Sequence, residues 1–308
     1  MKRSLVIGSR GSKLALWQAE HVRSQLQTID PNLTVRIEII KTTGDVKTEP
    51  LTVIGGKGVF TKELEDALVD GRIDLAVHSL KDLPTILPDS LTIAAICKRE
   101  DPRDALVVLV TQPIISLKDL PDEAIVGTSS QRRIAQLKSM CPRLKLKDLR
   151  GNVDTRLRKL DDGKYDALIL AAAGLRRLGL SDRINFAIPH SEMLPAVGQG
   201  AIAIETRADN EAAIDAAGKL QHDRTRIACV AERALLRSLG GGCQLPIAAH
   251  ALVDEKTLRL EALVASSDGA RIVRGAISGM PTNADELGAN LADQLRSDGA
   301  DAILQESL

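Results

Sequence analysis

The order of apolar and polar residues at the start of the chain predicts a buried strand, a polar glycine loop and then a helix. Apolar residues follow Ser4 as far as Ile7, and the loop Gly8-Ser9-Arg10-Gly11-Ser12 comes next. Beyond the loop, apolar side chains recur at the spacing of one helix face, at Ala15, Ala19, Val22 and Leu26. The same order returns with a strand at 124–126, the loop Gly127-Thr128-Ser129-Ser130 and a helix from about residue 131.

A second pair of similar segments supports two related lobes. Residues 70–77, DGRIDLAV, resemble residues 162–169, DGKYDALI, and each pattern predicts a helix end that turns into a buried strand. Strands alternate with helices in both copies, which predicts two α/β lobes with sheets rich in parallel strands. We expect residues 1–98 with 199–220 in the first lobe and residues 104–195 in the second. A polar linker at 99–103 and a return crossing at 195–200 would make a hinge.

The pattern changes after about residue 220 and predicts a third, smaller α+β domain at 221–308. A helix at 224–239 is followed by the loop Gly240-Gly241-Gly242-Cys243-Gln244-Leu245-Pro246. Strands are expected at 247–253, 258–265 and 272–278, and a final helix at 284–295. Because the turns between these strands are short, their sheet should be antiparallel.

Composition and charge exclude several classes of function. The chain has 308 residues, of which 44% are hydrophobic, and 41 basic side chains balance 41 acidic ones. A chain without net charge lacks the broad positive field that attracts nucleic acid or membranes, and its four aromatic residues offer little surface for stacking bases. No apolar run reaches membrane-spanning length, and the first residues are too few for a signal peptide. We expect a cytoplasmic protein without a nucleic-acid or membrane partner.

The two glycine loops are candidate anion sites. Each places backbone N–H groups, hydroxyls and arginine at a helix N-terminus, where partial positive charge favours an anion. Arginine binds carboxylates with two parallel hydrogen bonds, which favours a carboxylate or phosphate ligand. Any one of these arginines could instead lie on a solvated helix face. The candidates are Arg10 and Ser12 in the first lobe and Thr128, Ser130, Arg132, Arg133, Arg150 and Arg156 in the second.

Two further segments of the first lobe carry candidate chemistry. The polar run His78-Ser79-Leu80-Lys81-Asp82 follows a buried strand, and open α/β sheets bind ligands at the carboxyl ends of their strands. Asp82 could stabilise a developing cation or move a proton there, although an ordinary turn aspartate has the same pattern. The glycine-rich segment 55–60 is either a lid, with Lys57 and Phe60 touching a ligand, or a solvent loop.

Cys243 differs in its surroundings from Cys97, Cys141 and Cys229. The spacings between the four cysteines match neither a paired metal site nor a dense disulfide framework, so we expect thiols and no metal. Three glycines precede Cys243 and leave its sulfur accessible, which favours a tether point. A helix C-cap beside a half-buried thiol would give the same sequence.

Together these segments resemble the porphobilinogen deaminases, also called hydroxymethylbilane synthases, over nearly the whole chain. The resemblance is carried by residues 55–64, 78–84, 99–104, 127–133, 150–156, 194–200 and 240–246. It implies two lobes like those of periplasmic binding proteins, a hinge that includes Gln199, and a monomer. It also implies a dipyrromethane cofactor joined to Cys243 through a thioether and a catalytic carboxylate at Asp82. The implied cofactor- and substrate-binding residues are Arg10, Ser12, Ser79, Lys81, Thr128, Ser130, Arg132, Arg133, Arg150, Arg156 and Arg177.

The resemblance implies a transferase of tetrapyrrole biosynthesis. Four porphobilinogen molecules would condense in turn onto the tethered primer, each with loss of ammonia, before hydrolysis releases hydroxymethylbilane. Positive charge would develop on pyrrole nitrogen, where Asp82 could stabilise it, while arginines neutralise the acidic arms. Two alternatives remain from the residues alone. One is a two-lobed anion-binding or effector-sensing protein without catalysis, and the other is a transferase in which Cys243 turns over through a thioester.

Overall fold

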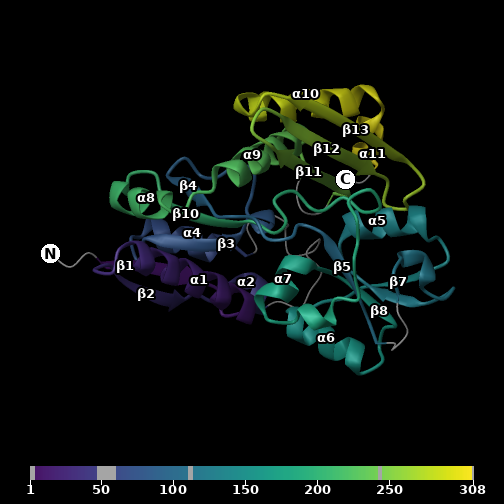
Figure 1. Ribbon diagram of the computed structural model, residues 1–308, viewed down its shortest axis with the longest axis horizontal. Coiled ribbons are helices and arrows are strands. Elements are labelled where there is room, and N and C mark those ends of the chain that lie inside the picture. The colour runs from purple at the N-terminus through teal and green to yellow at the C-terminus, as the bar shows by residue number, and fades with distance from the viewer. Residues whose placement is uncertain (1–3, 47–59, 110–113, 242–244, 307–308) are drawn as a thin grey trace. The chain divides into compact units, whose positions relative to one another are not determined.

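The structure of the chain is a computed structural model that describes residues 4–46, 60–109, 114–241 and 245–306. The chain divides into two compact units. The first unit contains Met1–Glu100 and Ala201–Ile227, and the second contains Asp101–Gly200 and Ala228–Leu308. Figure 1 shows the elements of each unit along the chain.

The first unit is built on a five-stranded sheet of order β2-β1-β3-β10-β4. Strands β2, β1 and β3 are parallel, and β10 is antiparallel to both of its neighbours, so four of the five strands point the same way. The reversed strand is the one that the chain enters on its return at residue 201. The strands are β1 (Ser4–Ser9), β2 (Thr34–Ile39), β3 (Leu75–Ser79), β4 (Leu91–Ile96) and β10 (Ile202–Arg207).

Helices cover both faces of this sheet. Ala19, Val22 and Leu26 of α1 pack in one core with Ala213 and Ala217 of α8. Leu64, Ala67 and Leu68 of α4 form the core on the other face. Burial of these apolar faces is the main force that holds the helices on the sheet. The helices are α1 (Lys13–Ile29), α2 (Thr43–Val46), α4 (Lys62–Val69) and α8 (Glu211–Gly218), with a 3-10 turn at Leu80–Asp82.

The second unit contains a sheet with the same plan, of order β7-β6-β8-β5-β9. Here too one strand, β5, runs against the others, and the chain enters it directly after its first crossing, at Asp104. Helix α5 covers one face of the sheet, and α6 and α7 cover the other. The elements are β5 (Asp104–Val108), β6 (Ile125–Gly127), α5 (Gln131–Met140), β7 (Lys145–Lys147), α6 (Val153–Asp161), β8 (Ala167–Ala171), α7 (Ala172–Arg177) and β9 (Phe186–Ala187), with 3-10 turns at 117–119 and 181–183.

The internal repeat predicted from the sequence is confirmed in atomic detail. Asp74 Oδ2 accepts a hydrogen bond from the Val6 amide at 2.8 Å, and Asp166 Oδ2 accepts one from the Ile125 amide at 2.7 Å. The glycine three residues before each aspartate has a φ of +69°. Each aspartate therefore joins the start of one strand to its parallel neighbour in the same way in both lobes.

The second unit also contains the predicted antiparallel sheet, of order β11-β12-β13. Helix α10 packs on β12 and β13, as Figure 1 shows in yellow. Ala135 of α5 packs with Ala248, Leu263 and Ala265 of this sheet and with Leu194. The elements are α9 (Asp223–Ser238), β11 (Ile247–Val253), β12 (Leu258–Ala265), β13 (Ile272–Gly279), α10 (Ala284–Ser297) and α11 (Ala300–Gln305), with a 3-10 turn at 281–283.

These sheets confirm the predicted fold class of two similar α/β lobes and a smaller α+β domain. Across the described ranges, no helix has the length and apolar character needed to cross a membrane.

Candidate active site and cofactor-binding residues

Polar side chains of the first unit gather where β1 and β3 end. The two strands are parallel neighbours, with Ile7 opposite Leu75, so their carboxyl ends lie at one edge of the sheet. Ser79, the last residue of β3, accepts a hydrogen bond from Gln18 Nε2 at 2.8 Å. Ser12 caps α1 by accepting from the Ala15 amide at 3.3 Å. The predicted residues Ser12 and Ser79 are thus placed by α1 at one end of the sheet.

Arg10 and Phe60 lie in contact in this unit. The guanidinium carbon of Arg10 is 4.2 Å from the centre of the Phe60 ring, which is a cation–π arrangement. The ring also lies close against Gly44, where a Cβ atom would be 2.1 Å from a ring carbon. The structure therefore brings together one predicted anion-binding residue and one predicted lid residue. Lys57 lies outside the described residues.

Asp82 ends the 3-10 turn that follows β3. The side chains on either side of the turn are anchored in the interior, because Leu80 and Leu83 are 1% and 3% exposed. Asp82 itself is exposed, and Lys81 is half-buried. An exposed carboxylate on a turn with buried anchors is held in place at the sheet edge while it stays accessible to a ligand.

A buried polar cluster lies behind this turn. His78 Nε2 is 2.9 Å from Glu205 Oε2, and both side chains are almost fully buried. Glu65 lies near the pair, and burial raises its pKa, an effect to which the charge of Glu205 adds. His78 is thus a core histidine whose side chain joins β3 to β10.

In the second unit, the loop after β6 is held by hydroxyls. Ser129 Oγ donates to the Leu149 carbonyl at 2.6 Å and accepts from the Leu149 amide at 2.9 Å. Ser130 precedes α5, and its amide donates to Thr128 Oγ1 at 3.3 Å. These bonds place Thr128 and Ser130 beside the loop that begins at Leu149.

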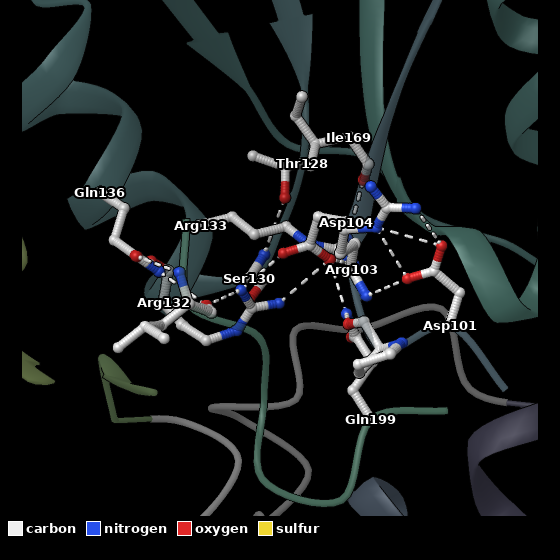
Figure 2. A network of polar contacts seen from close by, with 12 residues as sticks. Asp101, Arg103, Asp104, Thr128, Ser130, Arg132, Arg133, Gln136, Ile169 and Gln199 are labelled. Carbon is white, nitrogen blue, oxygen red and sulfur yellow. Dashed lines mark hydrogen bonds and ion pairs between the residues drawn. The ribbon is translucent and has the colours of Figure 1, made fainter. Parts of the chain in front are cut away.

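Arg132 and Arg133 point into the interior and meet one carboxylate, that of Asp104 (Figure 2). Arg132 Nη1 is 2.6 Å from Asp104 Oδ2, and Arg133 Nη2 is 2.7 Å from Oδ1. Burial alone would raise the pKa of Asp104, but the charges of both arginines outweigh it and hold that pKa far below its ordinary value. These arginines are therefore ordered by an internal partner, which their positions in the loop sequence did not indicate.

The same network fixes the return crossing. Gln199 Nε2 donates to the Pro102 carbonyl at 2.7 Å and to Asp104 Oδ1 at 2.9 Å, so one side chain joins both crossings of the chain. Arg177 Nη2 donates to the Gly200 carbonyl at 2.6 Å. Gln199 thus lies on the return crossing at 195–200, and Arg177 at the end of α7 donates to the last residue of that segment.

Arg150 and Arg156 lie around Gly151. Arg156 Nε donates to the Gly151 carbonyl at 2.7 Å, and Arg150 Nε is 3.0 Å from Asp148 Oδ2. Burial tends to raise the pKa of Asp148, but hydrogen bonds from Ser129 and Arg150 leave it lowered. The φ of +108° at Gly151 lets the loop make this turn.

Three acidic residues of this region were missed from the sequence. Asp101 pairs with Arg103 and Arg176, and Asp104 pairs with Arg132 and Arg133. Glu232 of α9 accepts from the Gly198 amide at 2.7 Å and from the Ala251 amide at 2.8 Å. Residues 99–103 were interpreted as a polar linker and Asp104 as the start of the second lobe, although aspartates at 101 and 104 beside an arginine-rich lobe were a usable signal.

The described residues of the second lobe fit a cofactor that carries a carboxylate. One buried carboxylate faces two guanidinium groups at Asp104, which leaves positive charge in the interior. Arg132 Nε is also buried without a hydrogen-bond partner among the described residues. Since buried charges and donors are normally paired, an acidic ligand suits this lobe. The predicted attachment residue, Cys243, lies outside the described residues.

Each α/β lobe carries arginines and hydroxyls in the loops after its strands, an arrangement typical of proteins that bind small acidic ligands. Comparison with known sequences identifies the family. Residues 5–215 match "Porphobilinogen deaminase, dipyromethane cofactor binding domain", and residues 226–297 match "Porphobilinogen deaminase, C-terminal domain". The chain belongs to the porphobilinogen deaminase family, and it is a transferase with a dipyrromethane cofactor.

Curated relatives match along nearly their whole length. Porphobilinogen deaminase of Chromobacterium violaceum is 52% identical over 301 residues, which cover 97% of this chain and 96% of that protein. The enzyme of Roseiflexus sp. is 51% identical over 305 residues and 99% of each chain. These relatives support catalysis over the alternative of a binding protein without activity.

Similar solved structures include the BenM effector-binding domain with benzoate and the methionine-binding protein MetQ. The first has a TM-score of 0.43 at 18% identity, covering 71% of this chain and 90% of that one. The second has a TM-score of 0.45 at 15% identity, covering 70% and 89%.

Proposed function

We propose that this chain condenses four porphobilinogen molecules, one after another, onto its dipyrromethane cofactor and then releases hydroxymethylbilane by hydrolysis. Each condensation forms a carbon–carbon bond and releases ammonia. The observation that carries the proposal is the full-length match to the family, together with an exposed Asp82 on an anchored turn. We further propose that it acts in the cytoplasm as a monomer, without nucleic acid, which size-exclusion chromatography and cell fractionation would test.

Asp82 is the proposed catalytic carboxylate. Loss of ammonia from the substrate and formation of the new carbon–carbon bond both place positive charge on a pyrrole ring. A nearby anion lowers the energy of these cationic intermediates. Asp82 can also accept a proton from the ring carbon after the bond forms. Leu80 and Leu83 hold the turn from both sides, so the carboxylate needs little rearrangement to act.

The arginines and hydroxyls are proposed to hold the acidic arms of cofactor and substrate. Guanidinium groups give paired hydrogen bonds to carboxylates, and hydroxyls add single ones. Each added ring brings two carboxylates, which explains a rich supply of arginine in a chain without net charge. The proposed set is Arg10, Ser12, Ser79, Lys81, Thr128, Ser130, Arg132, Arg133, Arg150, Arg156 and Arg177, with Lys57 and Phe60 on a lid and Gln199 at the hinge.

Cys243 is the proposed point of attachment, on a domain of residues 221–308 that is separate from the lobes at 1–98 with 199–220 and 104–195. When bound, the cofactor supplies a free pyrrole α-carbon as the nucleophile. The role of Cys243 is then to hold this primer through a stable thioether. Asp82 stabilises the positive charge on the pyrrole rings and accepts the proton that the ring carbon loses. A thioester mechanism would instead require Cys243 to exchange its adduct in each cycle.

Consumption of porphobilinogen with release of ammonia tests the activity directly. Asp82→Asn preserves size but removes the charge, so we expect turnover to fall by about 100-fold or more while the cofactor remains bound. Asp89→Asn, at an exposed aspartate on the segment between the turn and β4, is the matched control and should retain normal turnover. Normal turnover in Asp82→Asn would remove Asp82 from the mechanism.

Intact mass spectrometry tests the attachment. Cys243→Ala should have the mass of the bare polypeptide, whereas Cys141→Ala should keep the mass of a dipyrromethane. A dipyrromethane on Cys243→Ala would exclude the proposed tether. An adduct on the unaltered protein that appears only with substrate would favour the thioester mechanism.

A further inference from the structure

Asp104 is the centre of the network that Figure 2 shows, and the proposed mechanism gives it no role. It is the first residue of β5, its side chain has no exposed surface, and it accepts from three side chains distant in sequence. Arg132 and Arg133 approach it at 2.6 and 2.7 Å, and Gln199 at 2.9 Å. A single carboxylate thus sets the geometry of two proposed ligand-binding arginines and of the return crossing.

The charges in this network do not balance. Arg132 and Arg133 are 4% and 6% exposed and both ion-pair with Asp104, so two buried cations share one anion. Gln199 is neutral and adds a donor. A buried charge without a counter-ion is costly, and proteins normally pair it. Asp104 remains ionised at physiological pH, because the two arginines hold its pKa far below its ordinary value against the opposing effect of burial.

The unused donor of the network lies on Arg132. Its Nη1 donates to Asp104 and to the Leu194 carbonyl, whereas its Nε is buried with no hydrogen-bond partner among the described residues. The nitrogens of Arg133 are occupied by Asp104 and the Ile169 carbonyl. Surplus charge and an unused buried donor are two independent signs of a missing acceptor anion at the same place.

We propose that Asp104 is a positioning residue that neutralises one of these guanidinium charges and keeps the other as a fixed positive charge for one carboxylate of the bound pyrrole chain. The inference rests on the proposed function, because the acetate and propionate arms of pyrroles supply such carboxylates. Asp104 thereby limits this part of the site to a single acidic arm. Without Asp104, the arginines would repel each other and lose their common anchor.

Three variants change the charge count in steps. Arg133→Gln leaves one acid on one arginine and removes the surplus charge. Asp104→Asn removes the acid and raises the surplus to two. The double variant Asp104→Asn/Arg133→Gln restores a surplus of one. Asp161→Asn is the control, since Asp161 forms an exposed ion pair with Arg183 on the same lobe, and exposed pairs contribute little.

The first readout needs no cofactor and no activity. Each variant is prepared with Cys243→Ala, and its melting temperature is compared in sodium acetate and in sodium chloride at equal ionic strength. A carboxylate that fills the site should raise the melting temperature of the parent, because it binds the folded state alone. We expect no acetate-specific rise for Arg133→Gln, a larger rise for Asp104→Asn, and a rise like that of the parent for the double variant and for Asp161→Asn.

The second readout is cofactor loading, measured by intact mass with Cys243 present. Arg133→Gln and Asp104→Asn should each lose about tenfold or more of the dipyrromethane-bearing fraction, and the double variant should recover part of it. If Asp104→Asn does not fold, the comparison of Arg133→Gln with the parent tests the inference alone, because Arg133→Gln keeps the balanced ion pair between Asp104 and Arg132.

Two results would overturn the inference. One is a melting temperature that acetate raises equally in the parent and in Arg133→Gln, or raises in neither. The other is a normal dipyrromethane-bearing fraction in Arg133→Gln. If Asp104, Arg132 and Arg133 had only a structural role, the losses of cofactor loading in the two single variants would add up in the double variant, and no loading would be recovered. Failure of the proposed function looks different, since the unaltered protein would then carry no dipyrromethane and consume no porphobilinogen. In that case, the comparison of melting temperatures in acetate and chloride would still test whether Asp104 leaves one arginine charge for a carboxylate.

Discussion

Two glutamates on α4, only two residues apart, illustrate how surroundings set the behaviour of a single side chain. Glu63 Oε1 accepts from the Thr43 amide at 2.8 Å and from the Thr43 hydroxyl at 2.5 Å. Burial tends to raise the pKa of Glu63, but these bonds outweigh it and the pKa is lowered. Burial also raises the pKa of Glu65, and in its case the rise prevails.

Glu65→Gln should therefore stabilise the protein at neutral pH. Because its folded-state pKa is raised, the stability contributed by Glu65 is complete below its unfolded value of 4.5 and is lost as pH rises through the folded value. Glutamine imitates the protonated form and keeps that stability at pH 7. Thermal unfolding against pH should show a higher melting temperature for the variant at pH 7 and no difference below pH 4.5.

Glu63→Gln is the matched opposite. Its folded-state pKa is lowered, so its contribution is present above its unfolded value and is lost as pH falls through the folded one. Hydrogen bonds to a charged group contribute roughly 1.5 kcal/mol or more, so the variant should melt lower at pH 7 and converge with the parent in acid. The same sign for both variants would contradict these assignments.

Gly151→Ala should cost more than Gly163→Ala, although both glycines have positive φ. Gly163 lies at +69°, in the left-handed region, with open space around it. Gly151 lies at +108°, and a Cβ there would be 2.7 Å from a methyl carbon of Thr155. We expect the free energy of unfolding to fall by about 1 kcal/mol in Gly163→Ala and by about 2–3 kcal/mol in Gly151→Ala, as measured by denaturant unfolding. Equal costs would show that the loop at Gly151 can relax.

At this scale, the sequence indicates residues that act through their own loop better than residues that act through distant partners. The turn that carries Asp82 and the start of α1 after Ser12 could be predicted because strand, turn and helix follow one another locally. Asp104 could not, since its partners lie 28, 29 and 95 positions away and meet it only in the folded lobe. The burial of Arg132 and Arg133 was missed for the same reason.

Packing between helices decides the effect of a glycine at the scale of elements. A Cβ at Gly288 of α10 would be 2.3 Å from the Ala231 carbonyl oxygen of α9, so the two helix backbones touch there. A Cβ at Gly218, the last residue of α8, would meet nothing within 4 Å. The same substitution by alanine therefore has opposite consequences in two helices.

Gly288→Ala should destabilise the protein even though alanine favours helix by about 1 kcal/mol. The added methyl must push α10 away from α9, which opens the core beneath it. Gly218→Ala should be neutral or raise stability by up to about 1 kcal/mol. Melting curves of the two variants test this contrast, and a stabilised Gly288→Ala would mean that α10 is free to shift.

The elements themselves were largely predictable. The strands expected at 247–253 and 258–265 have those limits, and the helix expected from residue 131 begins there. Helix α11 was not expected, because its six residues carry too little periodic pattern. The antiparallel orientation of β5 and β10 was not expected either, since each pairs with strands far away along the chain, and such pairing depends on where the chain crosses between the units and not on local preference.

At the scale of the whole molecule, the return of the chain completes the first unit. Strand β10 lies between β3 and β4 in the sheet, so residues 1–100 alone lack an interior strand. Residues 101–308 contain every strand of both sheets in the second unit. The two fragments should therefore differ in their ability to fold.

A fragment of residues 1–100 should show no cooperative thermal transition by circular dichroism, because without β10 the interior strand β3 has an unpaired edge and β4 loses its only partner in the sheet. A fragment of residues 101–308 should unfold cooperatively, although its residues 201–227 lack their partners. Adding a peptide of residues 201–227 to the shorter fragment should restore structure to it. A cooperative transition in the shorter fragment by itself would show that β10 is dispensable for the first sheet.

The interior place of β10 also determines the order in which the two large sheets can form during synthesis. The ribosome finishes β4 at residue 96 but completes β10 only at residue 207, a delay of roughly 5–20 seconds at ordinary elongation rates. The other lobe needs only the contiguous residues 104–187 for its sheet and can close first. The lobe that is synthesised first therefore completes its sheet after the second lobe, and until then β3 and β4 expose unpaired strand edges on which chaperones can act during translation.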